Sequence, residues 1–173
     1  RKNTECEAWK ENKNLVDVPE TQFTGYDTAS DTARVLAIID ENGALQEASA
    51  EQNVRIFLDK TPFYPEGGGQ VADNGIMSTE IGQGYIFSVE KNDGIIAHCC
   101  EMTEGVIRVG DEVRCSVDAV KRNCTARNHT ATHLLQKALR EIIGAHVQQA
   151  GSSVNENMLR FDFSHFEAVT KEQ

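Results

Sequence analysis

The chain has 173 residues, a net charge of −10, 39% hydrophobic residues and 25% charged residues, which is the composition of a globular protein. This length suffices to bury a core without disulfides and allows one large domain or two small ones. The acidic balance argues against a general nucleic-acid-binding module, and we expect no membrane association because the sequence has no long apolar run and no secretory signal.

The five cysteines are odd in number and form no C-x-x-C motif, so the sequence predicts no disulfide framework. A reducing cytoplasm is therefore the expected location. Cys99 and Cys100 are neighbours in an expected strand, where they would point to opposite faces as small core or boundary residues.

The first 20 residues are polar, and we expect them to be a linker or the end of an upstream helix. Ala8–Glu11 would end such a helix, and Pro19 would break it. The chain starts at Arg1 without an initiator Met and stops just after a helix start at Thr170, from which we expect an excised piece of a longer protein.

Residues 21–117 are predicted to form a small, mostly antiparallel β-barrel. Short β-branched runs at 34–39 and 54–58, a hairpin of 85–89 with 95–98 and a closing strand at 111–117 recur with turn signals between them. The turn signals lie at 42–43, 73–75 and 92–94. A barrel is favoured over a sandwich because it leaves no open edge.

Residues 118–173 change to a helical period. Asp118 is a good N-cap and Gly144 a good C′ residue, so one long helix is expected over about 119–143. Its apolar stripe of Leu135, Leu139 and Ile142 is expected to pack beside the barrel. The alternation at 159–163 predicts a half-buried strand, which completes an α+β fold class.

His129 and His133 are the first candidates for chemistry, because residues four apart on a helix lie about 5–6 Å from each other on one face. Two imidazoles at this spacing can bind one tetrahedral zinc ion. The alternative is a pair of polar helix residues facing solvent. A metalloprotease motif is excluded because Thr130 stands where its glutamate would be.

Three further groups of residues are candidates. The string Glu66, Gly67, Gly68, Gly69 and Gln70 permits positive φ and close backbone approach, although its composition alone favours a wide turn between two barrel strands. Gln149 follows the helix in an expected loop and could orient a substrate or simply face solvent. Three basic residues gather at the start of the helix and are candidates for contact with a nucleic acid, which the resemblance below would make a tRNA: Lys121, Arg122 and Arg127.

Four strings occur together in an order that resembles alanyl-tRNA synthetases: FYPEGGGQ (63–70), RNHTATHLL (127–135), VQQAGS (147–152) and LRFDFSHFE (159–167). The resemblance covers roughly residues 20–173. Free-standing alanyl-tRNA editing proteins share part of the pattern, and the segment 18–26, which resembles the connector after the aminoacylation part, favours the synthetase over them.

The resemblance implies that residues 118–173 are the N-terminal half of an editing domain, which hydrolyses mischarged seryl- or glycyl-tRNA for alanine. It also implies that His129 and His133 are two of four zinc ligands, with the others outside the chain, and that Thr132 and Gln149 face the editing pocket. The ATP and magnesium site for charging would lie upstream. The expected partners are tRNA for alanine and the rest of the synthetase.

Two alternatives stay open at this point. The first is a free-standing editing protein, which would carry the missing ligands further along its gene. The second is a tRNA-docking barrel without chemistry, which the acidic charge disfavours.

Overall fold

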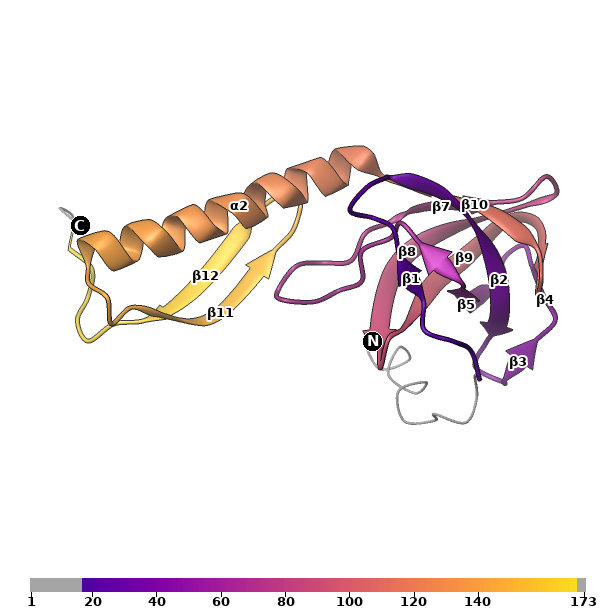
Figure 1. The fold of residues 1–173 in the computed structure, drawn as a ribbon, viewed down its shortest axis with the longest axis horizontal. Helices are drawn as coiled ribbons and strands as arrows, with labels where there is room; N and C mark the ends of the chain where they lie inside the picture. Colours follow the sequence, from indigo (N-terminus) through magenta and orange to yellow (C-terminus); the bar gives the residue numbers. More distant parts are fainter. Residues whose placement is uncertain (1–16, 171–173) are drawn as a thin grey trace. The chain divides into compact units, whose positions relative to one another are not determined.

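A computed structural model describes residues 17–170, which divide into two compact units (Figure 1). The first unit comprises the described residues up to Pro65 together with Ala72–Asp118. The second comprises the short segment Glu66–Val71 and the chain from Ala119 onward. The chain therefore enters the second unit twice.

The first unit is a closed antiparallel barrel of six strands, as the sequence predicts (Figure 1). The strands follow one another in the order β10-β7-β8-β9-β5-β2, and pairing of β10 with β2 closes the ring. Their bounds are β2 (Ser30–Ile39), β5 (Asn53–Leu58), β7 (Gly75–Ser78), β8 (Gly82–Asn92), β9 (Ile95–Arg108) and β10 (Glu112–Val117).

Four short strands extend the barrel. β3 (Ala44–Leu45) pairs with β2, and β4 (Glu47–Ser49) pairs with the end of β9. β1 (Gln22–Phe23) and β6 (Lys60–Thr61) pair with each other in parallel. The predicted hairpin turn between β8 and β9 is confirmed, since Asp93 and Gly94 both have positive φ, as a tight two-residue turn requires.

The barrel core follows the alternation of the strands. Val54, Ile56 and Leu58 on β5 are buried and point inward with period two. Phe57 points the other way, into a second small cluster with Ile39 and Ala97. Cys99 and Cys100 are both buried, as predicted for neighbours in a strand with apolar surroundings on each face.

Two polar side chains, His98 and Thr61, are fully buried inside this apolar unit. His98 on β9 is 0% exposed, and its Nδ1 donates to the carbonyl oxygen of Ile56 at 2.9 Å. Its Nε2 accepts from the hydroxyl of Thr61 at 2.7 Å, and the same hydroxyl oxygen accepts from the Phe63 N–H. Burial lowers the pKa of His98 to about 4, so the ring is neutral at pH 7.

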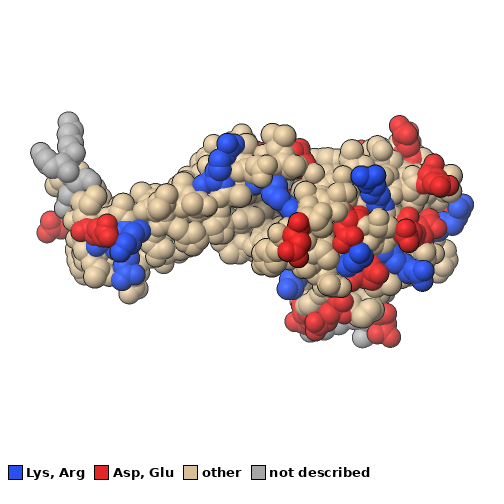
Figure 2. Space-filling model, turned by 45° about the horizontal axis from the view of Figure 1, so that its top comes forward, with Lys and Arg blue, Asp and Glu red and all other residues tan. Residues whose placement is uncertain are grey.

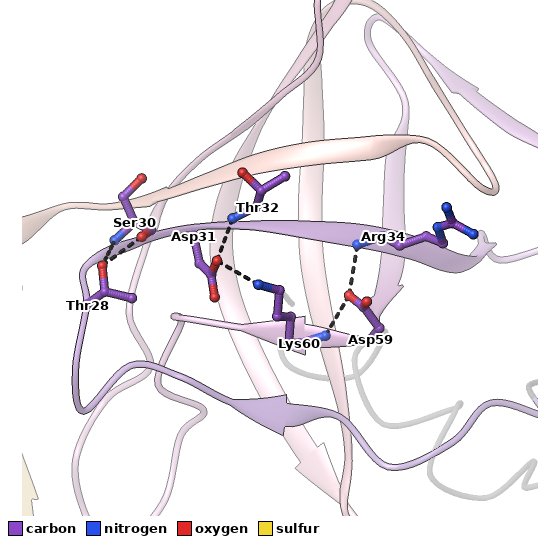
Figure 3. Close-up of polar contacts among 7 residues, drawn as sticks. All are labelled: Thr28, Ser30, Asp31, Thr32, Arg34, Asp59 and Lys60. Atoms are coloured by element: carbon purple, nitrogen blue, oxygen red, sulfur yellow. Dashed lines mark hydrogen bonds and ion pairs between the residues drawn. The ribbon is translucent and has the colours of Figure 1, made fainter.

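Asp59 joins β2 to the turn after β5 (Figure 3). Its Oδ1 accepts hydrogen bonds from the backbone N–H groups of Arg34 and Lys60, both at 2.8 Å. These bonds lie next to the irregularity in the β2–β5 pairing between Val35 and Ala37. Lys60 also lies 2.8 Å from Asp31, and its ammonium holds the pKa of that carboxyl below its ordinary value.

The second unit contains α2 (Ala119–Ile142), β11 (Gln148–Val154) and β12 (Leu159–Ser164). The helix bounds agree with the predicted 119–143, and Gly144 follows it with φ +137°, as expected of a C′ glycine. The helix packs on the antiparallel pair β11–β12.

Two expectations for this unit were wrong. Residues 148–152 were expected in a loop but belong to β11, which pairs with β12 from Gln148 to Val154 with one irregularity between Gln149 and Gly151. The stripe of Leu135, Leu139 and Ile142 was expected to be the packing face. The buried residues of α2 are instead Thr125 and Thr132. Of the stripe only Leu139 is half-buried, whereas Leu135 is 38% and Ile142 59% exposed.

Two predicted features lie outside the described residues: the helix end at Ala8–Glu11 and the continuation of a helix from Thr170 into 171–173. Over the part of the chain that the structure describes, no helix is long and apolar enough to cross a membrane.

Candidate functional site

The two predicted imidazoles lie together on α2. The ring centroids of His129 and His133 are 5.0 Å apart, with the ring planes tilted by 41°. His129 is half-buried and His133 is exposed. The i, i+4 spacing produces this approach, so the helix alone brings the two rings together.

His129 has a second partner that the sequence analysis did not identify. Its Nδ1 lies 2.7 Å from Oε1 of Gln70, which is 59 residues earlier in the chain. An amide oxygen can only accept, so the imidazole donates from Nδ1. In the neutral ring Nε2 then carries no proton and can bind a metal ion through its lone pair.

The glycine string positions Gln70. Gly67 and Gln70 form a reciprocal backbone pair at 3.2 and 3.0 Å, and Gly68 and Gly69 between them have φ of +60° and +80°. Positive φ at both central residues is typical of a type I′ turn, which favours glycine. The positive φ expected of the string is therefore present, and the alternative of a wide turn between barrel strands is wrong, because the turn is tight and belongs to the second unit.

The same turn lies against β11. Val71 N–H donates to the Val154 carbonyl at 3.0 Å, and Val154 N–H donates to the Gly69 carbonyl at 2.7 Å. A Cβ on Gly69 would lie 2.7 Å from the Ser152 carbonyl oxygen and would also overlap the Ser152 hydroxyl. Close backbone approach, the other property expected of the string, is therefore present at Gly69.

Thr132 and Gln149 lie in the same unit as the histidines. Thr132 is 8% exposed, and its hydroxyl donates to the Asn128 carbonyl at 2.8 Å. Its oxygen therefore keeps lone pairs that can accept a hydrogen bond. Gln149 is exposed on β11, and its Nε2 donates to the Ser152 hydroxyl at 2.9 Å. Asn128 holds the helix to the β11–β12 turn through a 2.7 Å bond to the Asn155 carbonyl.

The three basic residues lie on the first turns of α2, but they do not share one face. Lys121 and Arg122 are half-buried, whereas Arg127 is exposed and contacts Cys124 Sγ at 3.0 Å. At 100° per residue, Arg127 points more than 100° away from both. On the face drawn in Figure 2, acidic and basic side chains alternate over the barrel, and the middle of the helix–hairpin unit is mostly uncharged.

A second histidine pair lies at the other end of this unit. Nε2 of His146 is 2.8 Å from Nδ1 of His165, and the two rings stack at 5.1 Å. Within residues 17–170 no group of three or more histidine, cysteine, aspartate or glutamate side chains is placed to hold a metal ion. His129 and His133 thus offer two nitrogen donors, which fit part of a zinc shell.

Comparison with known proteins gives one family and many relatives. A family model described as tRNA synthetases class II (A) matches residues 1–121. An alanine--tRNA ligase of Thermoanaerobacter sp. (strain X514) is 49% identical over 154 residues, which are 89% of this chain and 18% of that protein. The alanine--tRNA ligase of Alkaliphilus oremlandii is 43% identical over the whole chain and 20% of its own length. That of Chloroflexus aurantiacus is 41% identical, over the whole chain and 19% of its own length. The chain therefore spans about a fifth of the length of these relatives.

Proposed function

The chain belongs to the class II tRNA synthetases, and we propose that it is part of an alanine--tRNA ligase whose helix–hairpin unit serves hydrolytic editing of mischarged tRNA. The substrates of editing are seryl- and glycyl-tRNA for alanine. The full enzyme charges tRNA with alanine in the cytoplasm, using ATP and magnesium at a site elsewhere in its chain.

One observation carries this proposal: the paired imidazoles of His129 and His133, one of which has its Nδ1 held by an amide oxygen. Ligating histidines in proteins usually donate their other ring N–H in this way. A hydrogen-bonded, half-buried ring is also less consistent with the alternative of two polar residues facing solvent.

Pocket physics explains why the full enzyme needs a second site. A small pocket for alanine must reject serine, which adds only a hydroxyl, and such a pocket discriminates by only about 10². A separate site can instead recognise the hydroxyl directly. Thr132 has the chemistry for this role, because its oxygen donates to Asn128 and can still accept from a substrate serine.

Zinc is the cofactor that suits the two imidazoles. When bound, it supplies positive charge that can polarise the ester, activate water or hold the substrate amino group. His129 and His133 provide two ligands, and the remaining two come from residues outside this chain. We therefore expect the 173-residue chain to hold no tight stoichiometric zinc, which metal analysis after mild chelation checks.

The partners follow from the same assignment. tRNA for alanine is the macromolecular substrate, and the rest of the synthetase completes the enzyme. Lys121, Arg122 and Arg127 are candidate phosphate contacts. Lys121 and Arg122 lie at the start of α2, where positive charge is unfavourable for the helix itself, so a role in binding would explain their presence there. The net charge of −10 indicates that most of the tRNA affinity resides elsewhere.

The test uses the full-length enzyme with His129→Ala and His133→Ala. Both variants should lose most of the deacylation of seryl-tRNA for alanine, whereas alanine charging stays close to the wild-type rate. His146→Ala is the matched control, because it removes an imidazole from the same unit at the other histidine pair.

If His133→Ala edits like wild type, or if charging falls as far as editing, the assignment of α2 to the editing site is wrong. The free-standing editing protein is less well supported, since the family model that matches residues 1–121 is that of synthetases. A gene that encodes no aminoacylation domain upstream would favour it.

A further inference from the structure

The strongest unexplained feature of the second unit is the contact between Gln70 and His129. The two side chains come from segments 59 residues apart and meet at 2.7 Å, through Oε1 of the amide and Nδ1 of the ring. Both residues are half-buried, so the bond is partly shielded from competing water.

The backbone around Gln70 is fixed on both sides. The Gly67–Gln70 turn closes through two hydrogen bonds on one side. On the other, the bonds of Gly69 and Val71 with Val154 attach the segment to β11. The amide oxygen is thus delivered to His129 by a short, doubly anchored loop rather than by a free side chain.

We propose that Gln70 is a positioning residue of the metal site: it accepts the Nδ1 proton of His129 and so keeps Nε2 deprotonated and aimed as a ligand. This inference rests on the proposed function, in which His129 binds zinc. A neutral imidazole otherwise exchanges between two tautomers, and only one of them leaves Nε2 able to bind a metal.

The inference gives the glycine string a role that its sequence alone leaves open. Gly68 and Gly69 allow the turn, and Gly69 also allows contact with Ser152. Both requirements serve the placement of the next residue, Gln70. The string therefore acts on the site through the contact of Gln70 with His129.

Two substitutions separate the hydrogen bond from the shape of the side chain. Gln70→Met keeps the length but removes the acceptor, whereas Gln70→Glu keeps an acceptor oxygen at the same position. Gln148→Met is the matched control, since Gln148 is exposed on β11 in the same unit.

The first readout is the ¹⁵N spectrum of the His129 ring at pH 8 in the 173-residue chain. Wild type and Gln70→Glu should show a protonated Nδ1, whereas Gln70→Met should shift toward a mixture of tautomers. The second readout is zinc affinity of the full-length enzyme, measured by competition with a chelator. Gln70→Met should weaken it about 10- to 100-fold, the range found for partners of metal ligands. Gln70→Glu and Gln148→Met should stay near wild type.

His129→Ala separates the failure of this inference from the failure of the proposed function. If His129→Ala releases zinc but Gln70→Met leaves both the tautomer and the affinity unchanged, Gln70 has no positioning role. If His129→Ala itself keeps zinc and editing, the proposed site is wrong. If Gln70→Glu loses zinc as Gln70→Met does, the acceptor is not what matters, and the inference is overturned.

Discussion

Protonation of His98 should make the barrel sensitive to acid. The ring is fully buried, and that burial lowers its pKa from 6.5 to about 4. In the unfolded chain the same group binds a proton at about pH 6.5, so acid favours unfolding. The stabilising contribution of the neutral ring is complete above pH 6.5 and is lost as the pH falls toward 4.

The magnitude follows from the shift. A difference of about 2.5 pH units between 6.5 and 4 corresponds to about 3.5 kcal/mol, at roughly 1.4 kcal/mol per unit. We expect the free energy of unfolding to fall by about this amount between pH 7 and pH 4 because of His98, in addition to any contribution from carboxylates.

The assay is urea unfolding followed by far-UV circular dichroism at several pH values, for wild type and His98→Gln. At pH 7 the variant should be less stable by roughly 1–3 kcal/mol, because Ile56 and Thr61 lose a buried partner. The difference between the two proteins should shrink as the pH falls.

Equal slopes of stability against pH for wild type and His98→Gln would refute this reasoning. So would a titration of His98 near pH 6.5 in the folded protein, followed by its ring proton resonances.

Three further outcomes are expected. In the full-length enzyme Thr132→Val should keep zinc but reduce the preference for hydrolysing seryl- over alanyl-tRNA by about 10- to 100-fold, the worth of one hydrogen bond, in paired deacylation assays. Burial raises the pKa of the Cys100 and Cys115 thiols to about 12. Iodoacetamide at pH 8 should therefore leave both thiols unmodified in the native chain, whereas Cys124, which is half-buried, should react. Peptide mass spectrometry measures the modification of each cysteine. Gly68→Ala and Gly69→Ala should each lower the free energy of unfolding by about 1–2 kcal/mol, because alanine is strained at positive φ. Gly69→Ala should lower the melting temperature more than Gly68→Ala does, because only a Cβ at position 69 meets Ser152. Equal melting temperatures of the two variants would contradict the close approach of Gly69 to Ser152.

The barrel was predictable because its turns and strands carry local signals. The Asn92–Gly94 turn needs positive φ, and its residues tolerate it. The length of β9 was not predictable in the same way. It runs to Arg108, through the acidic and glycine-containing stretch 101–105, because β8, β5 and β4 pair along it. Its partners rather than its composition decide its length.

β11 escaped prediction for a related reason. Its residues Gln148–Val154 contain only one β-branched apolar side chain, at Val154, which is typical of a loop. The strand forms because β12 pairs with both of its ends across an irregularity at Ala150, and because the glycine turn bonds to Val154. The prediction of the packing face of α2 was wrong for the reverse reason: Leu135 and Ile142 have the spacing of a packing face, yet both side chains are exposed. Periodicity identifies an amphipathic face without stating what covers it.

Of the candidate site, the sequence could predict the contact between neighbours on one helix but not the contact between distant segments of the chain. The approach of His129 to His133 follows from helical spacing and could be predicted. The contact of His129 with Gln70 depends on a connection between β6 and β7 that leaves the first unit after Pro65, joins the second unit, and returns at Ala72. A piece of chain that began at α2 would contain both imidazoles but would lack Gln70. It would also leave the Val154 end of β11 without its backbone partners at Gly69 and Val71, and unpaired strand edges are costly to expose. The helix that bears the histidines is therefore incomplete as a site without the loop supplied from within the barrel sequence.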